Sequence, residues 1–260
     1  MDPLRTLFAN AWQRFAARFW VLIWIFFIPG ALLVAGRLLS GRAGAGVRTV
    51  TAGGILSFIG TVVSIIASLA IINALAHGTD FKSSYRVGVK LFWAALWISI
   101  LNVLVVVGGL VLLIVPGIIL AVGLAFSNYA LVIEDRRGFS ALMQSREYVR
   151  GYWWAVVGRA LLVTLIFFAA LLIIYAPALL ILGQAIGSVV YLVLLLCFTA
   201  FSMSYTYEIF ENLRRQKPAR RAAPVAEGKR FLIVCFSVGI IAVAIFAFLG
   251  LIPGGFLHAG

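Results

Sequence analysis

Residues 91–133 read LFWAALWISILNVLVVVGGLVLLIVPGIILAVGLAFSNYALVI and contain no formally charged side chain. As one helix this run would be about 65 Å long, about twice the thickness of a bilayer core, so the chain must turn within it. Val115-Pro116-Gly117 supplies the means, because proline disfavours helical backbone at the preceding residue and glycine accepts positive φ. We expect a hairpin of Leu91–Val115 and Ile118–Ile133, with a re-entrant second arm as the alternative.

The composition extends this interpretation to the whole chain. Of 260 residues, 64% are hydrophobic and 11% are charged, and the mean hydropathy is +1.12. A soluble globular protein is about half apolar and about a quarter charged, so soluble enzymes, disordered chains and disulfide-rich domains are excluded. Cys197 and Cys235 lie in apolar runs and are expected to be buried hydrophobes. We expect an all-α, polytopic transmembrane helical bundle.

Seven spans are predicted, because Pro177 is expected to divide the apolar run 153–210 into a second hairpin. They are Phe19–Ala35, Gly54–Leu75, Leu91–Val115, Ile118–Ile133, Ala155–Ala176, Ile186–Tyr207 and Phe231–Ile252. Residues 1–213 would form a six-span membrane domain of helix-hairpin repeats, and residues 214–230 a basic cytoplasmic linker. Residues 231–260 would form a C-terminal transmembrane helix with a short tail.

The net charge of +13 predicts the orientation. With a cytoplasmic N-terminus and an external C-terminus, eighteen of the 21 lysines and arginines lie inside, as the positive-inside rule requires. Arg37, Arg42 and Arg48 in the outer loop, residues 36–53, are the exceptions. A shallow or re-entrant first hairpin would explain them. Nucleic-acid binding is excluded as a reason for the charge, because Trp and Phe lie mostly inside apolar runs.

An internal repeat is indicated by an offset of 61 residues. This offset places Ser84 on Ser145, Trp93 on Trp154, and Pro116 on Pro177. The two blocks, near 80–135 and 141–211, each begin with a basic amphipathic segment and continue with a span, a proline turn and a returning span. Both begin on the same side, which predicts a parallel repeat. Trp12, Arg14 and Phe19-Trp20 also precede a hairpin and are consistent with a third, more diverged copy.

The segment Glu134–Arg159 is the most informative for function. Ser140 is a good N-cap and Gly151 a plausible stop for a short amphipathic helix between them. Leu142, Met143, Val149 and Trp153 are expected to face the membrane, and Arg146, Glu147 and Arg150 to face water. Candidate contacts to anionic lipid headgroups are Arg136, Arg137, Arg146, Arg150, Trp153, Trp154 and Arg159, the last of which would snorkel to the interface. The alternative is an ordinary loop whose charges only fix the orientation.

The sequence offers little that points to catalysis. It contains no HExxH, P-loop, GxSxG or CxxC pattern, and His77 and His258 lie far apart. We therefore expect no enzyme activity, no cofactor and no metal. A passive transporter or channel lined by Asn102, Asn128 and Gln184 is the alternative function.

A resemblance rests on five segments of the chain. These are Leu112–Ile118, Tyr129–Glu134, Ala141-Leu142, Ser145 and Gly151–Trp154. Together they resemble the membrane domain of bacterial glycerophosphoryl diester phosphodiesterases and its stand-alone relatives, over about 81–214. The resemblance implies a module of the bacterial cytoplasmic membrane. In those enzymes the domain precedes a catalytic barrel, whereas here a basic linker and a seventh span follow, so phosphodiesterase activity is not carried over.

The leading hypothesis is thus a non-catalytic integral membrane protein. It would act on its cytoplasmic face through anionic lipid headgroups or through a partner, either another membrane protein or a second copy of itself. A membrane subunit of a lipid-metabolising system is a third possibility, after the passive transporter or channel.

Overall fold

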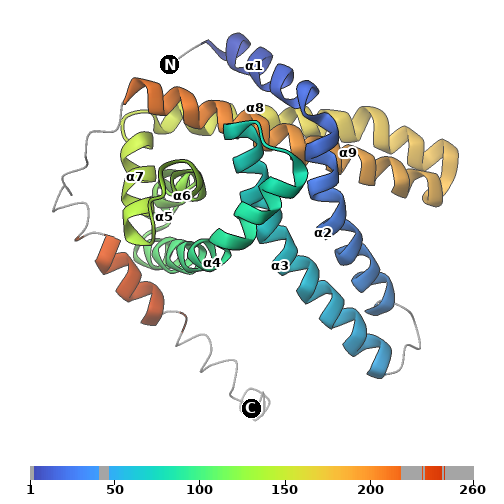
Figure 1. Cartoon of the computed structure of the whole chain (residues 1–260), viewed down its shortest axis with the longest axis horizontal. Coiled ribbons are helices and arrows are strands. Elements are labelled where there is room, and N and C mark those ends of the chain that lie inside the picture. Colours follow the sequence, from blue (N-terminus) through green and yellow to red (C-terminus); the bar gives the residue numbers. More distant parts are fainter. Residues whose placement is uncertain (1–2, 41–46, 218–229, 231, 242, 244–260) are drawn as a thin grey trace, which may run out of the picture.

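The computed structural model describes residues 3–40, 47–217, 230, 232–241 and 243, and in that part of the chain all regular structure is helical (Figure 1). The helices are α1 (Leu4–Ala17), α2 (Phe19–Ser40), α3 (Val47–His77), α4 (Phe81–Leu112), α5 (Ile114–Gly123), α6 (Ser127–Glu134), α7 (Phe139–Val149), α8 (Trp153–Ala170), the π-helical turn η1 (Leu171–Tyr175) and α9 (Ala176–Gln216). A further short helix covers Leu232–Ile241.

Six segments within the described residues are long and apolar enough to cross a membrane. They are Phe19–Ser40, Val47–His77, Phe81–Leu112, Ile114–Glu134, Trp153–Ile181 and Val190–Gln216. The chain is therefore an all-α, multi-pass membrane protein, which confirms the fold class predicted from composition. α2 with α3, and α8 with α9, form two long hairpins that run in different directions in Figure 1.

The seventh predicted span is described only over Leu232–Ile241, and the rest of it lies outside the described residues. This short helix packs closely on α4, because a Cβ on Gly108 would lie 1.7 Å from the carbonyl oxygen of Cys235. Most of the predicted linker, residues 218–229, also lies outside the described part. α9 continues to Gln216, three residues into the predicted linker.

The reversal between α4 and α5 occurs at Leu113, two residues before the predicted turn Val115-Pro116-Gly117. Leu113 has extended backbone, with φ −163° and ψ 141°, and α5 begins at the next residue. Pro116 and Gly117 therefore lie inside the first turns of α5, where proline costs little because its missing N–H needs no partner. Gly117 is required by space rather than by positive φ, since a Cβ there would lie 2.7 Å from the backbone nitrogen of Leu110.

Pro177 does not break its helix either. The π-helical turn η1 precedes it and leads directly into α9, so the predicted end of a span at Ala176 is wrong. A π turn changes the hydrogen-bonding register where proline would otherwise remove an i→i−4 bond. The chain bends instead at Gly183, which has φ 82° and ψ 174°. Gly183 lies between the two predicted spans, Ala155–Ala176 and Ile186–Tyr207.

A third proline, Pro29, is accommodated within α2 by a neighbouring helix. Proline at position 29 cannot donate to the carbonyl of Ile25, four residues earlier. The hydroxyl of Tyr85 in α4 donates to this carbonyl at 2.9 Å. Side chains from adjacent helices commonly satisfy backbone groups that proline frees inside membranes. This contact ties α4 to the first hairpin.

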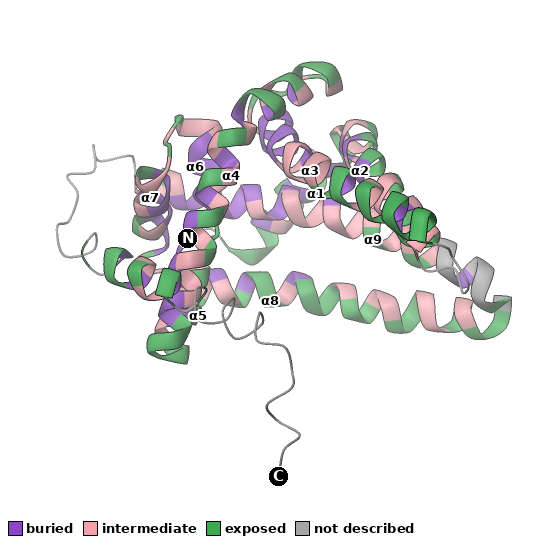
Figure 2. Ribbon diagram, turned by 90° about the horizontal axis from the view of Figure 1, so that it is seen from below, coloured by how far each residue is buried: buried purple, intermediate pink, exposed green. Residues whose placement is uncertain are grey.

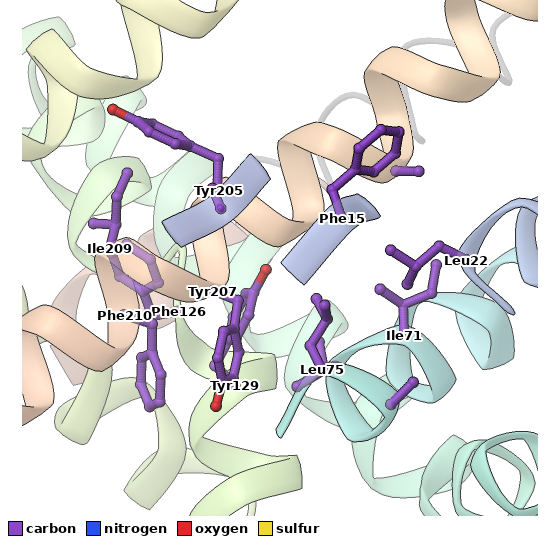
Figure 3. Packing of buried hydrophobic residues seen from close by; sticks show 14 of the residues in the cluster. Phe15, Leu22, Ile71, Leu75, Phe126, Tyr129, Tyr205, Tyr207, Ile209 and Phe210 are labelled. Atoms are coloured by element: carbon purple, nitrogen blue, oxygen red, sulfur yellow. The ribbon is translucent and has the colours of Figure 1, made fainter. Parts of the chain in front are cut away.

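Aromatic side chains build the centre of the core, around Phe210 of α9. Its ring lies 6.0 and 5.4 Å from those of Phe126 and Tyr129, measured between centroids (Figure 3). The ring of Tyr148 lies 5.6 Å from that of Phe210 by the same measure. Buried residues concentrate where α3, α4 and α6 meet, whereas most of α8 is exposed or intermediate (Figure 2). The middle helices therefore form the protein interior, and α8 offers most of its surface to lipid.

Close packing of α2 on α3 depends on two glycines. A Cβ on Gly36 would lie 2.8 Å from the carbonyl oxygen of Gly53, and one on Gly53 would lie 2.6 Å from that of Gly36. We expect Gly36→Ala to separate the helices and lower the free energy of unfolding by about 1–3 kcal/mol, as overpacking does.

Gly54→Ala is the matched control for this prediction, because no atom lies within 4 Å of a Cβ built there. This variant should be neutral or stabilising by up to about 1 kcal/mol through helix propensity. Unfolding in mixed micelles at increasing SDS fraction measures both. Equal stability of Gly36→Ala and Gly54→Ala would contradict the close approach.

Candidate functional site

The exposed arginines of the predicted lipid face are partly neutralised by neighbouring acids. Arg137 lies 3.2 Å from Asp135, and Arg150 lies 3.8 Å from Glu147. Arg146 is half-buried, and burial together with the nearby charge of Arg150 lowers its pKa. Two of these four arginines thus offer little net charge to a lipid, and a third is only half exposed.

Two side chains of α7 that were expected to face the membrane are instead buried in the protein. Leu142 and Val149 are 0% and 2% exposed, because α7 packs against α5, α6 and α9. The helix ends at Val149, close to the predicted stop at Gly151, but it begins at Phe139 after Gly138 rather than at Ser140. The amphipathic pattern of α7 therefore serves packing within the bundle.

The other predicted lipid contacts, Trp153, Trp154 and Arg159, differ in how far their side chains are exposed. Trp154 is 80% exposed at the start of α8, as a headgroup-level indole would be, while Trp153 is half-buried. Arg159 was expected to snorkel to the interface, but it is buried at 7% exposure. Its position one and a half turns inside α8 holds this residue within the protein.

Among the described residues, a cationic face with more exposed, unneutralised charge than the predicted one lies on α4. Its residues are not among the lipid contacts predicted from the sequence. Lys82, Arg86 and Lys90 are exposed and recur every four residues, followed by Trp93 and Trp97 at 75% and 55% exposure. At 100° per residue these five side chains fall within an arc of about 80° and along about 22 Å of helix. We call these five residues the α4 face.

The three cations of the α4 face have no hydrogen-bond or ion-pair partner among the described residues. The four-residue spacing that defines the face is visible in the sequence and could have identified it. The loop after α6 approaches one end of the face, because Gly138 lies against the indole of Trp97, with a Cβ–Nε1 distance of 3.7 Å if Gly138 carried a Cβ.

Acidic side chains inside the bundle are paired with arginines from distant segments. Arg14 of α1 forms an ion pair with Glu208 of α9, and its guanidinium also lies 5.0 Å from the ring of Tyr207. Glu134 at the end of α6 accepts a hydrogen bond from Tyr148 at 2.5 Å and lies 3.4 Å from Arg214. These charges are therefore compensated within the protein.

Lys217, at the end of α9, holds the C-terminus of α7. Its ammonium donates to the carbonyls of Glu147 at 2.6 Å and Arg150 at 2.5 Å, which are among the carbonyls that the end of a helix leaves without a partner. Burial lowers the pKa of Lys217, while Glu147 opposes the change. The first residue after α9 is thus fixed to the bundle rather than part of a free linker.

The residues proposed for a transport pathway do not converge on a described cavity. The side-chain amide of Asn102 donates to the carbonyl of Leu124 at 3.5 Å, and Asn128 has a buried oxygen without a partner. The side chain of Gln184 lies outside the described part of the structure. Among the described residues, no group of three or more His, Cys, Asp or Glu side chains is placed to hold a metal ion.

Comparison with known proteins gives no relative: no family model, no curated protein and no solved structure matches this chain.

The hydrogen bond from Tyr148 to Glu134 predicts a pH-dependent contribution to stability. Burial and this hydrogen bond raise the pKa of Tyr148 to about 12. The neutral phenol is thus favoured in the folded state, and its contribution is complete below about pH 10, the pKa of an unperturbed tyrosine. It is lost as the pH rises toward the folded-state pKa of about 12. We expect Tyr148→Phe to cost about 1–3 kcal/mol near neutral pH and less as the pH passes 10.

Unfolding of the wild type and the variant in detergent, followed across this pH range, measures the difference. Tyr191→Phe, which removes a hydroxyl from a residue that is 40% exposed, should have no effect. A neutral-pH cost no larger than that of Tyr191→Phe would show that the bond to Glu134 contributes nothing.

Proposed function

We propose that this chain is a non-catalytic membrane protein that binds anionic lipid headgroups through the α4 face. The observation that carries the proposal is a run of three cations, Lys82, Arg86 and Lys90, that have no partner in the described part of the chain. They are directly followed on the same side of one helix by exposed Trp93 and Trp97. Indoles concentrate at the headgroup level of a bilayer, and cations just outside it meet lipid phosphates.

The order of side chains along α4 supports a lipid as the ligand. After Trp97 the exposed side chains are aliphatic, including Ile100 and Val103. One helix therefore passes from charged through aromatic to aliphatic surface, which is the order of layers that a lipid monolayer presents from headgroup to acyl chain. A soluble anion would be matched by the cations alone and would leave the two indoles without a role.

The expected preference of the α4 face for anionic lipid follows from its number of cations. A lysine or arginine near an anionic membrane surface contributes about 1 kcal/mol, so three contribute about 3 kcal/mol, or roughly 100-fold in lipid preference at low salt. The contribution falls as ionic strength rises, because exposed charges are screened over about 10 Å at 0.1 M salt.

We also propose that the α4 face lies in the cytoplasmic leaflet of a bacterial membrane, with the N-terminus inside. Support comes from the positive-inside distribution and from two contacts between segments predicted to be cytoplasmic. Arg14 near the N-terminus contacts Glu208, and Arg214 contacts Glu134 at the end of α6. The resemblance to the membrane domain of bacterial glycerophosphoryl diester phosphodiesterases favours the same setting.

Neutralising the α4 face tests the proposal. Lys82→Gln/Arg86→Gln/Lys90→Gln should reduce the ratio of phosphatidylglycerol to phosphatidylcholine bound by the protein at least about fivefold, the effect of one cation near the surface. The ratio is measured on purified protein equilibrated with mixed micelles of the two lipids.

Two control variants separate this face from other charges. Arg37→Gln/Arg48→Gln removes exposed cations at the far end of the α2–α3 hairpin, and Arg137→Gln/Arg150→Gln removes cations that have acidic neighbours. Both should change the ratio less than the α4 variant does. An unchanged ratio in the α4 variant, or an equal loss in either control, overturns the assignment of lipid binding to the α4 face.

A further inference from the structure

The same nine-residue interval separates a buried small residue from an exposed tryptophan at three places. Ser84 and Ser145 are both 0% exposed, and Trp93 and Trp154, nine residues later, are 75% and 80% exposed. The N-terminal segment has the same arrangement, because Ala11 is 0% exposed and Trp20 is 71% exposed. In the first and third copies the interval runs from a short helix, α1 or α7, to the start of a long apolar helix, α2 or α8. In the second copy both residues lie within the continuous helix α4.

The three short segments also make equivalent contacts. The start of α4 packs on α3, where a Cβ on Gly88 would lie 2.5 Å from the carbonyl oxygen of Ile66. α7 packs on α6, and the ion pair of Arg14 with Glu208 joins α1 to α9. Each short segment thus lies against the helix that ends the preceding hairpin, and the contact of α1 with α9 closes the series into a ring.

We propose that the chain consists of three copies of one helix-hairpin unit, and that the second copy alone carries the lipid-phosphate site. The positions 11, 7 and 3 residues before each tryptophan are equivalent in this alignment. In the second copy they are Lys82, Arg86 and Lys90; in the first, Ala9, Gln13 and Ala17; in the third, Met143, Glu147 and Gly151.

The equivalent face is open to the surroundings in the other copies as well. Ala9, Gln13 and Ala17 are all exposed, as are Glu147 and Gly151, while Met143 is intermediate. These positions are therefore exposed or partly exposed in all three copies, and only in the second copy do they carry cations, which have no partner among the described residues. The ligand is the phosphate of an anionic lipid in the bilayer, bound where the register to the tryptophan places the cations at headgroup depth.

Moving the cations to the first copy tests this inference, which rests on the proposed function. Ala9→Lys/Gln13→Arg/Ala17→Lys is introduced into the Lys82→Gln/Arg86→Gln/Lys90→Gln background. We expect the graft to restore at least half of the lost preference for phosphatidylglycerol over phosphatidylcholine in mixed micelles. The charge-reversed graft, Ala9→Glu/Gln13→Glu/Ala17→Glu, should restore none, and excess inorganic phosphate should not abolish the restored preference.

A second graft covers the case in which the first disturbs α1. Met143→Lys/Glu147→Arg in the same background places two cations on the third copy and should restore part of the preference. A folded graft, judged by its unfolding transition, that restores nothing at either copy overturns the equivalence of the three faces, while the proposed function stands. If the starting triple variant loses no preference, it is the proposed function that fails.

Discussion

The packing of α1 and of the end of α9 on the bundle depends on one requirement: two buried carboxylates must be neutralised. Glu208 and Glu134 lie among apolar helices with side chains 7% and 9% exposed, and an unpaired charge there would cost several kcal/mol. Arg14 and Arg214 supply the compensating charges from α1 and from the end of α9. Because Arg14 also approaches the carbonyl of Leu75 at 3.4 Å, one side chain joins the first helix to both α3 and α9.

This pairing divides the cations of the protein into two groups. Half-buried arginines, such as Arg14 and Arg214, neutralise buried acids and hold helices together. The lysines and arginine of the α4 face have no such partner among the described residues and remain available to a ligand outside the protein. A net charge of +13 therefore has a structural part and a surface part, and only the surface part bears on lipid binding.

The sequence predicted the parts of the fold that depend on the length of apolar runs. Six spans were found close to their expected positions, because a bilayer requires about 20 apolar residues per helix wherever they occur. The positions of the turns were less predictable. Pro116 and Pro177 are compatible with the first turn of a helix, and Leu113, where the chain reverses, has no local sequence signal.

The site was harder to predict than the fold, since it depends on which cations are already paired. The arginines after α6 stand out in sequence, but Asp135 and Glu147 lie beside two of them. The contact of Arg14 with Glu208 joins residues far apart in the chain, and periodicity alone does not reveal it. In contrast, the four-residue spacing of Lys82, Arg86 and Lys90 is visible in the sequence. To identify these residues as the site, one needs in addition only the structural finding that they have no partner among the described residues.

The depth of the α4 face in a bilayer tests the central claim most directly. Single spin labels at positions 82, 86, 90, 93, 97 and 100, in protein reconstituted into bilayers, report their accessibility to oxygen and to a water-soluble nickel chelate. We expect the chelate to reach positions 82–90, oxygen to dominate at 97 and 100, and the crossover to fall near Trp93. Full access of the chelate to all six positions, or burial of 82–90 in the hydrocarbon core, would contradict a headgroup-level cationic face.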